Sequence, residues 1–339
     1  MMAKQIRLKD IARKLGLSPA TVSQAFNNPK LINRKTRQRV FELCNESGYV
    51  RKKYKKGRNN AIGILGESFY ITLGGFYNFV TTSLLQYAHR KKINTLIGSF
   101  EADDDLLPSM VTKGLVDGLV LIGRFTRENV MRLKQENLPL VLCGNPIPGV
   151  ELHTVVPDGR AGIYAVTRHL LDLGHKKITT ITGGPLFDPI TSDRLDGYRF
   201  ALAEAGLAFN ERSIAQANFY DLSTVAAAVG KLLAQLERPT AIVCACDAIA
   251  YTAIQLLQEK GIRVPQDISV TGFDDLPFPD FIEPYKPQLT SARVDLEQLG
   301  RVAVDVLAEI IANPAKSAYR HTLPTELIVR KTSVPPFKA

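Results

Sequence analysis

Hydrogen-bonding side chains gather on one short segment near the amino terminus. Ser18 and Pro19 suit the start of a helix, because serine can cap free N–H groups and proline has no N–H to leave unpaired. Val22 and Phe26 lie four residues apart, so on a helix both would face inward. The residues left on the outside, most of them able to form hydrogen bonds, are Ala20, Thr21, Ser23, Gln24 and Asn27.

Two further helices are expected around this segment. The first carries one apolar stripe and ends at Gly16, and the third begins with Asn33 as its cap. Three short helices with an exposed second helix are the layout of a helix-turn-helix, which places one helix in the major groove of DNA. The apolar positions that would hold the helices together are Leu8, Ile11, Ala12, Leu15, Val40, Phe41, Leu43 and Cys44.

The charge distribution supports a nucleic-acid partner. Residues 1–60 hold 16 of the 43 Lys+Arg but only 3 of the 33 Asp+Glu, whereas the remaining residues hold 27 and 30. The whole basic excess therefore coincides with the three-helix segment and its tail, as expected of a module that binds the phosphates of double-stranded DNA. A basic segment that serves only solubility is the alternative. In the tail, the predicted DNA contacts are Arg51, Lys52, Lys53, Tyr54 and Lys55.

From Ala61 onward, short apolar runs alternate with amphipathic segments, which predicts an α/β fold with parallel sheets covered by helices on both faces. About 280 residues exceed what one such sheet needs, so two lobes are expected. Strands are expected at 61–65, 93–98, 118–122, 139–143, 177–182, 241–245 and 268–272. Helices are expected at 76–91, 106–113, 128–136, 161–173, 193–205, 223–235 and 248–260.

Ligands of open parallel sheets bind beyond the carboxyl ends of the strands. Those ends offer carboxylates, one arginine and several aromatic rings, which suits a small polyhydroxylated or amine-bearing ligand. Simpler interpretations stand beside this one: Asp247 could cap the helix that follows it, Asp275 a turn, and Arg194 could form a surface ion pair. The candidate ligand contacts at these ends are Phe69, Tyr70, Phe125, Arg194, Cys246, Asp247, Phe273 and Asp274.

Catalytic and metal chemistry finds no support in the sequence. The five histidines have no Ser, Cys or carboxylate partner at telling spacing, and Cys244 and Cys246 are too close for the usual zinc pair. We expect these two cysteines to lie on one face of a strand and to bind no metal. No secretory segment precedes Leu8 and no run of about 20 apolar residues is present, so we expect a reduced, cytoplasmic protein that is not an enzyme.

Motifs along nearly the whole chain resemble the lactose-repressor/galactose-repressor (LacI/GalR) family of bacterial transcription regulators. In the head these motifs are Asp10-Ile11-Ala12, Ser18, Thr21-Val22-Ser23, Asn27, Thr36-Arg37, Val40 and Gly48-Tyr49. In the body they are residues 116–118, Val156, Asp158, Gly174-His175, Arg194, Gly197-Tyr198, Asp247, residues 268–274 and Pro287-x-Leu289-Thr290.

The resemblance implies a homodimeric repressor that binds a near-palindromic operator and is nucleoid-associated when bound. It implies a small effector, expected to be a carbohydrate, between two lobes that resemble a periplasmic sugar-binding protein. Neither a further cofactor nor association with a membrane is expected. The implied domains are a head (1–50), a basic hinge (51–60) and a body (61–339). Lobe 1 would comprise about 61–157 and 292–322, and lobe 2 about 158–291 and 323–339.

The resemblance also assigns roles to single residues. Base contacts would come from Pro19, Ala20 and Gln24, and phosphate contacts from Thr21 and Ser23. Effector contacts would come from Arg194, Cys246 and Asp274, with Phe69, Phe125 and Phe187 as packing surfaces.

Three departures from the family pattern stand out. Residues 51–60 lack the proline and the leucine of the usual hinge helix, Cys246 replaces an asparagine, and Gly159 stands where asparagine commonly follows Asp158. A thiol cannot replace the donor and acceptor of an amide, which keeps open a regulator with an atypical effector or none. Two less favoured alternatives are a solute-binding receptor and a DNA-associated enzyme.

Overall fold

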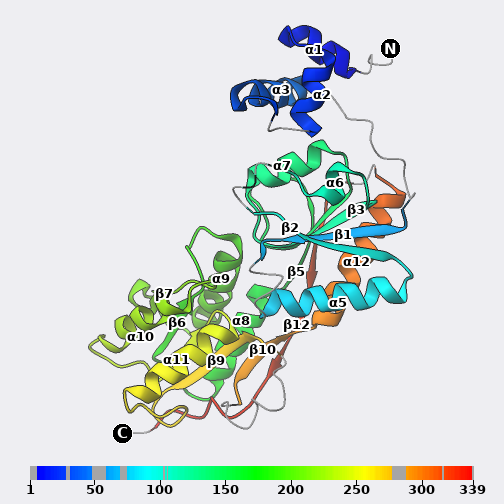
Figure 1. The fold of residues 1–339 in the computed structure, drawn as a ribbon. Helices are drawn as coiled ribbons and strands as arrows, with labels where there is room; N and C mark the ends of the chain where they lie inside the picture. Colours follow the sequence, from blue (N-terminus) through cyan, green and yellow to red (C-terminus); the bar gives the residue numbers. More distant parts are fainter. Residues whose placement is uncertain are drawn as a thin grey trace. The chain divides into compact units, whose positions relative to one another are not determined.

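The computed structural model describes residues 6–27, 31–47, 59–68, 75–101, 104, 106–276, 288–314 and 317–337. The carboxyl-terminal body confirms the predicted α/β class, and the first helices confirm the predicted helix-turn-helix. Contacts divide the chain into two compact units (Figure 1). Unit 1 comprises 1–155 and 300–320, and unit 2 comprises 156–299 and 321–339.

The head consists of α1 (Leu8–Leu15), α2 (Pro19–Asn27) and α3 (Arg34–Ser47). Gly16 ends α1 in the left-handed region at φ 66°, where its N–H bonds back to the helix. Asn33 caps α3 as predicted, since its Oδ1 accepts from Thr36 N at 2.7 Å. The buried core of the head is made of Ile11, Ala12, Val22, Ala25, Val40 and Cys44.

The sheet of unit 1 has the strand order β11-β5-β4-β3-β1-β2. Its strands are β1 (Ala61–Gly66), β2 (Asn94–Ser99), β3 (Gly118–Gly123), β4 (Leu140–Gly144), β5 (His153–Pro157) and β11 (Arg320–Leu323). The neighbouring strands β2, β1, β3 and β4 pair in parallel. One face packs on α6 (Ser109–Thr112) and α7 (Arg127–Gln135). The other face packs on α5 (Phe76–Arg90) and α12 (Leu296–Ala312), where Gly118 leaves room for Leu307.

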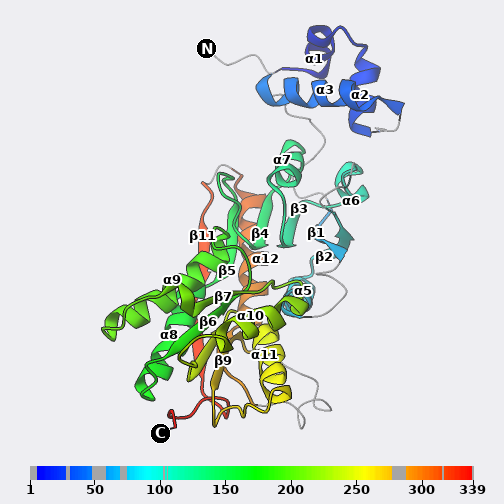
Figure 2. The ribbon, with the colours of Figure 1, turned by 90° about the vertical axis from the view of Figure 1, so that its left-hand side faces the viewer.

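The sheet of unit 2 has the order β12-β10-β9-β8-β6-β7. Its strands are β6 (Ile178–Thr182), β7 (Ile214–Gln216), β8 (Ala241–Cys244), β9 (Ser269–Asp274), β10 (Thr290–Val294) and β12 (Thr325–Ile328), and only the pairing of β10 with β12 is antiparallel. Figure 2 shows α8 (Gly159–Asp172) and α9 (Pro189–Glu204) on one side of this sheet. The other side packs on α10 (Val225–Leu233) and α11 (Asp247–Glu259), with η3 (Leu222–Thr224) leading into α10 and η2 (Glu211–Ser213) preceding β7.

Several elements differ from the prediction. α9 begins at Pro189 and not at 193, because Asp188 caps it by accepting from Ile190 N and Thr191 N at 3.1 and 3.2 Å. The predicted helix 106–113 is reduced to α6, which starts after Pro108. The prediction included no element beyond residue 272, and it missed β5 and the three-residue β7.

The chain passes between the units at 155/156, 299/300 and 320/321. The largest difference from the predicted boundaries concerns residues 292–299, which the sequence assigned to lobe 1. Residues 292–294 belong to unit 2 because β10 pairs with β9 on one side and with β12 on the other. The contact division assigns the first residues of α12, up to Leu299, to the same unit.

Candidate DNA-binding surface and ligand site

The start of α2 is fixed by its own side chains. The Oγ of Ser18 accepts a hydrogen bond from Thr21 N at 2.9 Å and lies 2.8 Å from the Thr21 hydroxyl, with Pro19 as the first helical residue. This cap orients the first turn without using the outward face. Val22 is fully buried, and Phe26 packs edge-on against Phe41 at 5.0 Å between ring centres.

The outward face of α2 carries the predicted contact residues. Pro19, Ala20 and Gln24 are exposed, and Thr21 and Ser23 are half-buried. Asn27 ends the helix, and its side chain lies outside the described residues. The predicted contacts of the basic tail, Arg51, Lys52, Lys53, Tyr54 and Lys55, also lie outside them.

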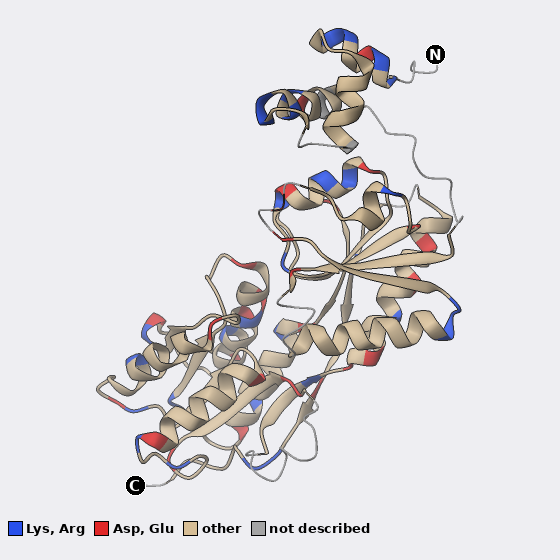
Figure 3. Ribbon diagram, viewed as in Figure 1, with Lys and Arg blue, Asp and Glu red and all other residues tan. Residues whose placement is uncertain are grey.

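Positive charge flanks this face and does not lie on it. α2 contains no charged residue, whereas α1 and α3 carry most of the basic side chains of the head (Figure 3). A neutral hydrogen-bonding helix between two basic helices can read bases while its neighbours contact phosphates. The basic residues of α1 and α3 are Lys9, Arg13, Lys14, Arg34, Lys35, Arg37 and Arg39.

In unit 2, Arg194 of α9 forms the centre of a buried group at the carboxyl ends of the strands. Its Nη1 donates to the Ala245 carbonyl and its Nη2 lies 3.8 Å from Asp274 Oδ1. The guanidinium carbon lies 4.0 Å from the ring centre of Phe273 and 5.4 Å from that of Phe219. Arg194 is 9% exposed, so the alternative of a surface ion pair is wrong.

Asp274 and Cys246 lie next to this arginine. Asp274 is buried at the end of β9 with φ 114°, a backbone conformation that non-glycine residues rarely adopt. Burial raises the pKa of its carboxyl group, although Arg194 acts in the opposite direction. Burial also raises the pKa of the Cys246 thiol to about 12, so the sulfur is a neutral thiol at physiological pH. A neutral thiol and a carboxyl group beside a fixed arginine provide few but directional hydrogen bonds.

Asp247 has a different role from the predicted helix cap. Its Oδ1 accepts from the Ser291 hydroxyl at 2.6 Å and its Oδ2 accepts from Leu276 N at 3.1 Å, so it joins α11 to β10 and to the end of β9. Burial is the main cause that raises its pKa to about 7. Gly272 makes room for it, because a Cβ there would lie 2.3 Å from Asp247 Oδ1.

Asp275 is not merely a turn residue. It accepts from Arg293 Nε at 2.8 Å and from Arg330 Nη2 at 3.0 Å, with a further bond from Arg330 Nη1. Burial raises the pKa of the Asp275 carboxyl, but the bonds from Arg330 and Arg293 together outweigh it and hold this pKa below its usual value. This cluster could not be predicted, since its members come from three separate segments.

Other predicted ligand contacts lie in different surroundings. Phe125 is buried in the core of unit 1, so its ring contacts apolar side chains there. Phe187 is 85% exposed before α9, and Phe69 and Tyr70 lie outside the described residues. Phe219 was missed because it follows β7, which is too short to give a periodic signal; its ring lies directly on Gly183, where a Cβ would come within 2.1 Å.

Cys244 and Cys246 are both buried and free. Cys244 is the last residue of β8, whereas Cys246 lies outside the strand and directly precedes α11. Within the described ranges, no group of three or more His, Cys, Asp or Glu side chains could hold a metal ion. The helices of the described parts include none with the length and apolarity needed to cross a bilayer.

Comparison with known proteins gives matches in both parts of the chain. The family model described as "Bacterial regulatory proteins, lacI family" matches residues 7–52. The model described as "Periplasmic binding protein-like domain" matches residues 167–333. The ribose operon repressor of Haemophilus influenzae is 30% identical over 335 residues, covering 96% of this chain and 98% of that protein. The transcriptional repressor PurR of Vibrio campbellii is 27% identical over 336 residues, covering 96% and 98%.

Among solved structures, the complex of the transcriptional regulator CelR with cellobiose has the same fold, with a TM-score of 0.72 at 24% identity. The alignment covers 97% of this chain and all of that one. The similarity therefore extends over the head and the body together.

Proposed function

We propose a role for each site from one premise: the chain belongs to the LacI family of bacterial regulatory proteins. It is a sequence-specific DNA-binding transcriptional regulator, and its relatives are repressors. It represses transcription as a homodimer on a near-palindromic operator, with one α2 in the major groove of each half-site. The observation that carries this function is the exposed, capped and uncharged face of α2 between two basic helices.

Base reading is assigned to Pro19, Ala20 and Gln24, the exposed residues of that face. Gln24 is the main reader, because a glutamine amide can donate to N7 and accept from N6 of adenine at once. Thr21 and Ser23 contact phosphates or support the helix. The basic residues 51–58 add sequence-independent affinity through phosphate contacts.

The effector contacts of unit 2 are assigned to Arg194, Cys246, Phe273 and Asp274, to which we add Phe219. A carbohydrate fits this set, because hydroxyl groups bind carboxyl and guanidinium groups while apolar sugar faces pack on aromatic rings. Effector and operator binding are then coupled reciprocally, by typically ~1–3 kcal/mol.

A second candidate is a regulator whose effector is atypical or absent. The neutral, buried thiol of Cys246 favours it, because this position provides no amide donor or acceptor. In either case we propose that the protein works in the cytoplasm without a cofactor and without catalytic turnover.

The test is an operator selection followed by fluorescence anisotropy with and without candidate sugars, ribose and cellobiose first. Arg194→Ala should lose the effector response and keep operator affinity within about twofold, because Arg194 belongs to the body and not to the head. Arg199→Ala is the matched control, since Arg199 lies on the same helix but is exposed and pairs with half-buried Asp196. An intact response in Arg194→Ala refutes the effector site, and failure to select any sequence refutes the DNA function.

A further inference from the structure

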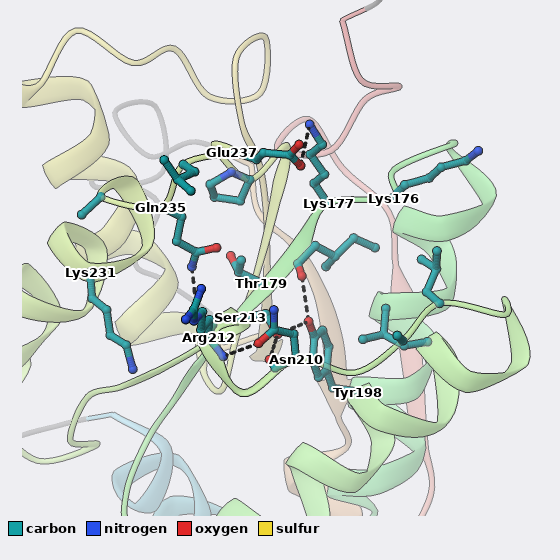
Figure 4. A pocket seen from close by; sticks show the side chains of 17 residues that line it. Lys176, Lys177, Thr179, Tyr198, Asn210, Arg212, Ser213, Lys231, Gln235 and Glu237 are labelled. Atoms are coloured by element: carbon teal, nitrogen blue, oxygen red, sulfur yellow. Dashed lines mark hydrogen bonds and ion pairs between the residues drawn. The ribbon is translucent and has the colours of Figure 1, made fainter.

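A cavity of about 580 Å³ opens in unit 2 at the end of the sheet opposite to Arg194 and Asp274. It lies at the amino-terminal ends of β6 and β7, where Ile178 begins one strand and Ser213 precedes the other (Figure 4). The carboxyl-terminal halves of α9 and α10 complete its walls with Tyr198, Leu202 and Lys231. Nothing in the proposed regulatory cycle uses this end of the unit.

The lining of this cavity reverses the charge balance of the body. It contains four cationic side chains and a single carboxylate, Glu237, although residues 61–339 hold more acidic than basic side chains. The cationic residues are Lys176, Lys177, Arg212 and Lys231. A local positive excess within an acidic body attracts small anions.

The existing contacts leave much of this charge available. Glu237 pairs with Lys177 at 3.1 Å, but both side chains are more than half exposed, so the pair is weak. Lys231 Nζ donates to the Ile214 carbonyl at 2.9 Å, which leaves two of its three N–H groups for a ligand. In the described structure, no carboxylate lies within ion-pair distance of the Arg212 guanidinium.

Hydrogen bonds hold the backbone of Arg212 in place, while its guanidinium group forms no ion pair in the described structure. Arg212 N donates to Asn210 Oδ1 at 2.9 Å, and Gln235 Nε2 donates to the Arg212 carbonyl at 2.9 Å. In Figure 4 the first bond lies within the segment before β7, and the second joins this segment to Gln235, just after α10. A guanidinium on a fixed backbone loses less conformational freedom on binding an anion than one on a mobile loop.

The rest of the lining is mostly apolar. Tyr198 forms part of the wall but is fully buried, and its hydroxyl group donates to the Ile178 carbonyl at 2.7 Å. A volume of this size matches pockets for small metabolites, for which typical values are about 300–1,000 Å³. The apolar lining residues are Ile178, Leu202, Leu207, Ala208, Ala234, Leu236 and Pro239.

We propose that this cavity binds a small organic phosphate. Its phosphate group lies against Arg212 and Lys231, because a planar guanidinium forms paired bonds with phosphate oxygens. Its organic part packs on the apolar lining. The site is separate from the effector contacts and does not depend on their assignment.

Isothermal titration calorimetry on the full-length protein tests the proposal, with AMP, glucose 6-phosphate and inorganic phosphate as probes at low ionic strength. At least one organic phosphate should bind at least tenfold more tightly than inorganic phosphate, and Arg212→Glu should weaken its binding at least tenfold. Arg238→Glu is the matched control, because Arg238 is exposed beside the cavity but does not line it. It should change the affinity by less than about threefold, because Arg238 does not line the cavity and forms no direct bond to a ligand held there.

Repeating the titration with Arg194→Ala separates the two sites. Organic phosphate binding that survives Arg194→Ala and is lost in Arg212→Glu supports the proposal. Binding with the opposite dependence belongs to the carboxyl-end site and overturns it. The absence of binding by all three probes at millimolar concentration, or equal affinity for organic and inorganic phosphate, overturns it as well.

Discussion

The exposed face of α2 and the buried group around Arg194 are both proposed as binding sites, but they are built in opposite ways. On α2 the proposed contacts Pro19, Ala20 and Gln24 are exposed, and each can act on its own. Around Arg194 the proposed contacts are buried or half-buried and gather around its guanidinium, and they come from α9, β9, the residue before α11 and the segment after β7. Single changes should therefore alter recognition in the head but both recognition and folding in unit 2.

The largest expected effect is that of Gly272→Ala in unit 2. The new Cβ would lie 2.3 Å from Asp247 Oδ1 and 2.7 Å from Leu289 Cδ2, so the free energy of unfolding should fall by about 3 kcal/mol. Urea unfolding measures this loss. Gly230→Ala in α10 is the control, because nothing lies within 4 Å of its Cβ and alanine favours helices. Equal effects of the two changes would show that the Asp247 packing is not tight.

Asp247→Asn should change the pH dependence of stability. Because the pKa of Asp247 is raised to about 7 in the folded protein, its contribution is present in acid and is lost as the pH rises through 7. Between pH 5 and 7 the wild type should lose about 2 kcal/mol more stability than Asp247→Asn. Urea unfolding at several pH values gives the difference. Parallel pH profiles of the two proteins would contradict the buried, partly protonated carboxyl group.

Gln24→Ala should weaken operator binding by about 2 kcal/mol and relax the preference at one base pair, without changing the stability of the head. Binding to a set of operators with single substitutions measures both effects. A uniform loss over all these operators would make Gln24 a phosphate contact, and a loss of stability would remove the contrast with unit 2.

Ser18→Ala should have the smallest effect. It removes the acceptor for Thr21 N at 2.9 Å, so the stability of the head should fall by about 1 kcal/mol. Circular dichroism during thermal unfolding detects this loss, and Ser18→Asp serves as the control because aspartate also caps helices. A lower stability of Ser18→Asp would show that Ser18 does more than cap α2.

The head could be predicted closely from the sequence because its signals are local. Gly16, Ser18 and Asn33 fix helix ends through bonds to residues three or four positions away. The alternation of the body likewise gave the two parallel sheets. Elements with weak local signals, such as β7 and the strands after residue 288, were missed.

Phe219 and the Asp275 cluster could not be predicted in the same way. Asp275 reaches Arg293 and Arg330, which are far away in the sequence, and neither pairing leaves a periodic pattern. The same is true of Asp247, whose partners Leu276 and Ser291 lie in later segments.

The sequence by itself determined the helix-turn-helix, the outward face of α2, the basic charge of the head and the α/β class of the body. Each depends on residues within one or two helical turns or on composition. Only the tertiary structure decided that Arg194 is held between aromatic rings, that Asp247 joins three segments, and that residues 292–299 belong to unit 2. The physical reason is that burial and long-range pairing arise only when distant segments pack together.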